Sequence, residues 1–119
     1  MMRNDKTNII VDKTFNFALD IVEFTEQLYE KNRFALANQI FKSGTSIGAN
    51  VHEAQNAESK NDFIHKMKIS AKETDETGFW FKLCEKSPYL PTPDEKMKTE
   101  LQEIHLILNK IISTSKTGN

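Results

Sequence analysis

The segment KSGTSIGANVHEAQ, residues 42–55, decides the fold, because its glycine pair is compatible with three different structures. Gly44 and Gly48 suit a phosphate-binding loop, a membrane dimerisation face or a crowded soluble helix. A Walker A loop reads G-x-x-x-x-G-K-[S/T], whereas this segment reads G-T-S-I-G-A-N. No apolar run approaches the roughly 18 residues that span a bilayer. We therefore interpret it as a helix in which close packing offsets a cost of about 1 kcal/mol per glycine relative to alanine.

Length and composition point to one small domain, residues 1–119. The 16 Lys and Arg nearly balance 17 Asp and Glu, giving a formal charge of -1, so no strong basic field would hold nucleic acid non-specifically. The one cysteine, Cys84, cannot form an internal disulfide, and the first residues lack the apolar stretch of a signal peptide. We expect a cytoplasmic protein.

Helical spacing runs through the whole chain. Apolar residues recur at gaps of three and four, no segment alternates like a half-buried strand, and the three prolines cluster in KSPYLPTPDEK. The pattern predicts helices at about 13–30, 33–57, 60–86 and 93–114, the last capped by Thr92 with Pro93 at its first position. Short connections require antiparallel neighbours, so we predict an all-α, up-down-up-down four-helix bundle.

The first predicted helix has two apolar faces. One face holds Phe17, Ile21, Phe24 and Leu28, and the other holds Phe15, Leu19, Val22 and Tyr29. At 100° per residue these faces lie well over 90° apart, so one core cannot cover both. The second face predicts contact with another subunit, and the alternative is that the N-terminal segment NIIV folds back over it.

Polar residues interrupt the apolar stripes of the two middle helices. The stripes read Leu36, Ile40, Ser43, Ile47, Asn50, Ala54 and then Ile69, Glu73, Glu76, Trp80, Leu83. Buried carboxylates are costly unless they are paired or hydrogen-bonded. We therefore expect a polar layer that fixes helix register, built from Ser43, Ser46, Asn50, Glu53, Glu73 and Glu76. Gly78 is a third candidate for close helix packing.

No constellation of catalytic or metal-binding residues can be assembled from the sequence. A di-iron bundle needs Glu-x-x-His pairs, but the chain offers Glu73-x-x-Glu76 and Asp62-x-x-His65. Cys84 lies in an apolar cluster and has no histidine placed to activate it. We expect no catalytic residue, no metal and no cofactor.

One group of basic residues is a candidate nucleic-acid surface. It comprises Lys60, His65, Lys66, Lys68 and Lys72, with Lys42 added from the opening segment. Glu58 and Asp62 are interleaved, so an ordinary solvated face is the alternative interpretation. Repetition of the group around an oligomer would raise its local field enough to favour RNA or DNA.

Two long segments resemble the small bacterial four-helix bundle proteins encoded within intervening sequences of 23S ribosomal RNA genes. They are KTFNFALDIVEFTEQL and QIFKSGTSIGANVHEAQNAESKNDFIHKMKISAKETDETGFWFKLC. The most specific positions are Ser43, Ser46, Ile47, Ala49, Asn50, Glu53, Ala54, Phe63, Glu73, Glu76, Thr77 and Trp80. The chain departs from the family pattern at Lys42, where Arg is common, and at Gly78 and Phe79, where a longer polar residue and Tyr are common.

The resemblance implies an antiparallel bundle that assembles as a ring-like homopentamer. It also implies kinship with the accessory variability determinant of diversity-generating retroelements, a pentameric bundle that engages a reverse transcriptase and nucleic acid. No enzymatic activity comes with the family. The leading hypothesis is a non-enzymatic oligomeric scaffold associated with RNA or with a nucleic-acid enzyme. The alternatives are a protein-interaction module without nucleic-acid binding and, more distantly, a metal-binding bundle enzyme.

Overall fold

A computed structural model describes the backbone of residues 5–117 and the side chains of residues 9–117. The helices are α1 (Asp5–Glu30), α2 (Phe34–Ala54), α3 (Lys60–Lys86) and α4 (Glu95–Thr117). Residues 5–117 contain no strand, which confirms the all-α prediction. α1 begins well before the predicted residue 13, so the NIIV segment continues the helix and does not fold back over its second face.

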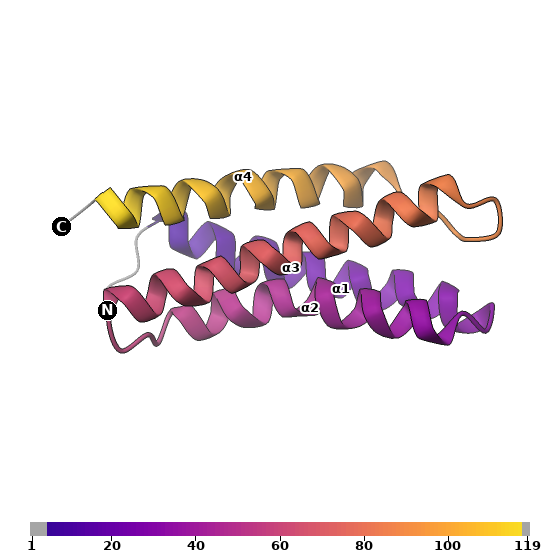
Figure 1. Ribbon diagram of the computed structural model, residues 1–119, viewed down its shortest axis with the longest axis horizontal. Helices are drawn as coiled ribbons and strands as arrows, with labels where there is room; N and C mark the ends of the chain where they lie inside the picture. Colours follow the sequence, from indigo (N-terminus) through magenta and orange to yellow (C-terminus); the bar gives the residue numbers. More distant parts are fainter. Residues whose placement is uncertain (1–4, 118–119) are drawn as a thin grey trace.

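The four helices lie side by side in an elongated bundle (Figure 1). The bundle measures 49 × 20 × 19 Å. α1 packs against α2 and α4, and α3 packs against the same two helices, so the elements form a square with α1 and α3 on one diagonal. Figure 1 shows the chain turning back at each connection, which leaves every helix beside the one that follows it.

Local signals explain where the helices stop and start. Asn32 adopts a left-handed backbone conformation, φ 60°, between α1 and α2, which asparagine tolerates better than most residues. Ser59 accepts a hydrogen bond from the Asp62 amide at 3.0 Å. At α4, Asp94 accepts from the Met97 amide at 2.8 Å, so the cap is the carboxylate of Asp94 and not the predicted Thr92.

The core is apolar along α1, α2 and α4, and more polar along α3. α1 buries the predicted face of Phe17, Ile21, Phe24 and Leu28. α3 instead buries a stripe that includes three hydroxyl residues: Phe63, Met67, Ser70, Thr74, Thr77, Phe81 and Cys84.

The predicted α3 stripe was wrong for a definable reason. Thr74 donates to the Ser70 carbonyl oxygen at 2.9 Å and Thr77 to the Glu73 carbonyl oxygen at 2.8 Å. Each hydroxyl is thereby satisfied by its own helix, which makes it inexpensive to bury. The carboxylates of Glu73 and Glu76 have no such partner and lie outside the buried stripe, where Glu76 is exposed and Glu73 half-buried.

Candidate interaction surfaces

A pair of buried hydroxyl contacts joins α2 to α3. Ser70 donates to the Ile47 carbonyl oxygen at 2.8 Å. The Oγ1 atom of Thr77 lies 3.0 Å from the Oγ atom of Ser43. A hydroxyl has one proton and two lone pairs, so Thr77 satisfies both neighbours by donating to Glu73 and accepting from Ser43. These contacts fix the register of the two helices.

This hydroxyl pair differs from the predicted polar layer. Of the six predicted residues only Ser43 is fully buried, and its partner is Thr77, not a carboxylate. Asn50 donates to the Ser46 carbonyl oxygen at 2.8 Å within α2. The remaining three lie outside the buried stripe. Glu53 pairs with Lys66 at 3.1 Å, and Glu76 accepts from Trp80 Nε1 at 3.3 Å. Glu73 is half-buried and makes no side-chain hydrogen bond within residues 9–117.

Glu73 is a half-buried carboxylate that lies near the carboxylate of Glu76. Partial burial raises its pKa first, and the neighbouring charge of Glu76 raises it further. Lys42 and Lys72 lower the pKa in opposition. Glu73 and Glu76 therefore form an acidic pair at the α3 surface, near Lys42 and Lys72, and do not form a buried polar layer.

Removing the Thr77 hydroxyl tests the importance of the buried pair. We expect Thr77→Val to lower the free energy of unfolding by about 1–3 kcal/mol, because Ser43 is left buried with a single 3.5 Å contact to the Ile40 carbonyl. Urea denaturation gives the value. The matched double variant, Ser43→Ala with Thr77→Val, should lose less than the sum of the two single changes. Strict additivity would contradict the pairing.

The three helical glycines fall into two groups. A Cβ on Gly44 would lie 2.6 Å from the Ile21 side chain, and a Cβ on Gly48 would lie 3.0 Å from the Thr14 backbone oxygen. Both positions therefore let α1 and α2 approach closely. A Cβ on Gly78 would meet only Leu101 Cδ2, at an ordinary 3.8 Å, so the packing of this chain does not require that glycine.

The second apolar face of α1 stays uncovered in the single chain. Phe15 is 62% exposed, Leu19 54% and Val22 40%, while Tyr29 packs partly against the core. Beside this face runs an open groove of about 700 Å³ between α1 and α2, with Gly48 and Ala49 in its wall. We call Phe15, Leu19 and Val22 the α1 outer face.

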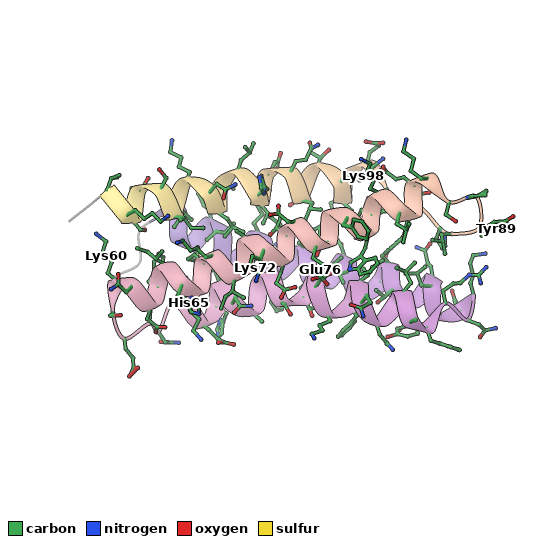
Figure 2. All side chains as sticks on the ribbon, in the orientation of Figure 1. Lys60, His65, Lys72, Glu76, Tyr89 and Lys98 are labelled. Atoms are coloured by element: carbon green, nitrogen blue, oxygen red, sulfur yellow. The ribbon has the colours of Figure 1, made fainter. Side chains whose placement is uncertain are left out.

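The candidate basic residues are dispersed along α3 (Figure 2). Lys60 lies at the start of the helix, and His65 and Lys72 follow along its length. Lys66 forms an ion pair with Glu53, and Lys42 lies near Glu73. Lys68 meets a partner that sequence reasoning missed: Lys116 of α4 lies so close that it lowers the Lys68 pKa.

The described residues contain no group of three or more His, Cys, Asp or Glu side chains that could hold a metal ion. Cys84 is fully buried, and burial followed by the charge of Glu85 raises the pKa of its thiol to about 11. That thiol stays protonated at neutral pH and is a poor nucleophile. No helix among residues 5–117 is long and apolar enough to cross a membrane.

These features define a small helical bundle in which buried hydroxyl groups join α2 to α3 and one apolar face of α1 stays exposed. The chain belongs to the 23S rRNA-intervening sequence protein family, whose model matches residues 6–110. No curated protein matches it.

A solved structure supports the same assignment. The chain is 39% identical to a protein of unknown function of the S23 ribosomal protein family from Bacteroides thetaiotaomicron. The match covers 92% of this chain and 99% of that one, with a TM-score of 0.85. This similarity extends over nearly the whole of both chains, so it supports both the four-helix fold and the family assignment.

Proposed function

We propose that the protein is a non-enzymatic scaffold that associates with itself through the α1 outer face. The single observation that carries the proposal is the exposure of Phe15, Leu19 and Val22 on a helix that buries another complete face in its own core. A surface helix ordinarily has one apolar stripe, and contiguous exposed apolar residues mark interaction sites. We take a homopentamer as the expected assembly, on the strength of the family resemblance, and the cytoplasm as its location.

Charging the α1 outer face should abolish assembly. We expect the wild-type chain to form an oligomer at micromolar concentration and the double variant Phe15→Glu/Leu19→Glu to scatter light as a single chain of 13.7 kDa. Two unpaired carboxylates in an apolar interface would have to be desolvated, and the free-energy cost of that burial opposes assembly. The measurement is size-exclusion chromatography with multi-angle light scattering.

A matched control is Tyr89→Glu, because Tyr89 is 75% exposed in the loop before α4 and lies outside the α1 outer face. It should assemble as the wild type does. A wild-type protein that remains monomeric at micromolar concentration would overturn the scaffold proposal.

A nucleic-acid partner is the second candidate, favoured by the contact between Lys68 and Lys116. Two adjacent ammonium groups attract phosphate. His65 and Lys72, both exposed on α3, extend the same positive region, which we call the α3 basic patch together with Lys68 and Lys116.

Binding to structured ribosomal RNA should weaken steeply with salt if this patch contacts phosphates. Lys72→Ala should reduce the slope of log affinity against log salt by about 1. The control is Lys31→Ala, an exposed lysine in the α1–α2 turn, which should leave the slope unchanged. Fluorescence anisotropy at several salt concentrations gives both values. Undetectable binding at low salt would favour the pure protein-interaction module.

A further inference from the structure

Gly78 lacks the reason that explains the other two helical glycines. α1 fills the space that a side chain at Gly44 or Gly48 would need, whereas a Cβ on Gly78 would make only an ordinary contact with Leu101 Cδ2 at 3.8 Å. A glycine inside a helix costs about 1 kcal/mol relative to alanine. Close packing within residues 9–117 does not offset that cost at Gly78, and the missing side chain leaves a surface accessible beside it.

That surface is a shallow groove of about 430 Å³ between α3 and α4, which we call the Gly78 groove. Its wall is mainly apolar and is formed by Thr74, Asp75 and Gly78 from α3 and by Leu101, Gln102, His105 and Leu106 from α4. Leu106 stands 68% exposed on its rim. The Asp75 carboxylate already has a partner, His105 Nδ1 at 3.5 Å.

Unneutralised lysines lie beyond both ends of the Gly78 groove. Lys82 follows Gly78 by one helical turn and has no acidic partner among the described residues. At the other end, Lys68 has only Lys116 beside it. The carboxylates of this seam, Asp75 and Glu85, each lie beside a basic side chain of α4, His105 and Lys98. The seam between α3 and α4 therefore carries an excess of positive charge.

The α1 outer face has the opposite arrangement. Its apolar centre is bordered by Asp12 on one side and by Glu23 and Glu26 on the other. None of these three carboxylates has an ion-pair partner among residues 9–117. The lysine of this part of α1, Lys13, is turned away and bound to Glu100 and Glu103 of α4.

We propose that the Gly78 groove receives the α1 outer face of a second copy of this chain, with Phe15 seated over Gly78. The inference rests on the proposed self-association and specifies its second surface. The two surfaces differ, so the contact is heterologous, joins copies head to tail, and closes into a ring when the rotation between copies allows.

The spacing of the charges agrees with one orientation. At 1.5 Å per residue, Glu26 lies about 16 Å beyond Phe15 on α1, and Lys68 lies about 15 Å from Gly78 on α3. In the other direction, Asp12 lies about 4 Å before Phe15 and Lys82 about 6 Å after Gly78. An α1 helix laid antiparallel to α3 of the second copy therefore brings Glu26 to Lys68 and Lys116, and Asp12 to Lys82.

Mixing two assembly-defective variants tests the head-to-tail contact. Gly78→Leu fills the groove, and Phe15→Glu/Leu19→Glu destroys the α1 outer face. Each variant alone should scatter light as a monomer. Their equimolar mixture should form a 1:1 heterodimer of twice the monomer mass, because each keeps the one surface that the other lacks. Circular dichroism should report undiminished helix in Gly78→Leu, since leucine is a good helix former and the groove is open.

A charge exchange tests the same contact without filling the groove. Asp12→Lys and Lys82→Asp should each weaken assembly about fivefold, the upper range for a surface ion pair, and the combined variant should recover the wild-type value. Both changes are on the surface and leave the core intact.

The outcomes separate the two proposals. A monomeric wild type ends the scaffold proposal and this inference together. An oligomeric wild type whose Gly78→Leu variant assembles normally, with no heterodimer in the mixture, overturns the Gly78 groove alone and leaves the α1 outer face to another mode of contact, such as α1 against α1.

Discussion

Replacing Phe17 with alanine should lower the free energy of unfolding by about 3–5 kcal/mol, the range for deleting a buried phenylalanine side chain. Phe17 is fully buried. Its ring centroid lies 6.3 Å from that of Phe81, which in turn lies 6.0 Å from Phe24 in an edge-on arrangement. The change opens a cavity where α1 meets α3 and removes one partner from this aromatic cluster.

Urea denaturation at one fixed protein concentration gives the value for Phe17→Ala, because oligomerisation makes apparent stability depend on concentration. Tyr89→Ala is the control, since it removes an exposed aromatic ring and should change the free energy by less than about 0.5 kcal/mol. A loss below about 1 kcal/mol for Phe17→Ala would contradict the central place of the aromatic cluster.

Leucine at Gly44 or Gly48 should each cost about 3 kcal/mol, the upper part of the range for overpacked cores. The two sites should differ in what rescues them. The atoms that would meet a side chain at Gly44 belong to the Ile21 side chain, whereas at Gly48 the nearest is the Thr14 backbone oxygen. A side chain can be removed by mutation and a backbone cannot.

The rescue experiment combines each leucine variant with Ile21→Ala. In the Gly44→Leu background the second change should restore much of the lost stability, so the double variant loses less than the sum of the single losses. In the Gly48→Leu background the losses should add or worsen. Equal behaviour of the two pairs in thermal or urea unfolding would contradict the assignment of their neighbours.

The fold could be predicted from the sequence wherever the spacing of apolar residues was unambiguous. The two faces of α1 illustrate this, because Phe17 and Ile21 are buried and Phe15 and Leu19 are exposed, as their angular separation required. The prolines and the short polar segments located the connections. These inferences depend only on the geometry of one helix at a time.

The stripe of α3 was missed because two rows of residues share helical spacing. One row has Trp80 and Leu83 with two carboxylates, and the other has Phe81 and Cys84 with three hydroxyls. Hydropathy alone does not rank them, since a threonine bonded to its own helix carbonyl behaves in the core almost as an apolar residue. Counting Ser70, Thr74 and Thr77 as buriable would have identified the inner row.

The candidate surfaces depend on contacts between residues that are distant in the sequence. Such contacts cannot be predicted from residue spacing within a single helix. Lys68 and Lys116 meet because α3 and α4 are neighbours, so neither position signals the other. Likewise all three helical glycines look equivalent in the sequence. Only the packed bundle distinguishes Gly44 and Gly48, which face α1, from Gly78, where a Cβ would meet only Leu101.

The square of helices is joined unevenly, and this bears on how the bundle opens. α1, α2 and α3 are held by glycine contacts and buried hydroxyl bonds, whereas the polar links of α4 are surface ion pairs such as Lys96 with Asp20 and Lys98 with Glu85. Such pairs contribute about 0–1 kcal/mol each and weaken with salt. Amide hydrogens of α4 should therefore exchange with solvent before those of α2. An α1 helix from a neighbouring copy, bound along the Gly78 groove, would contact α4 from outside and slow the exchange of its amide hydrogens.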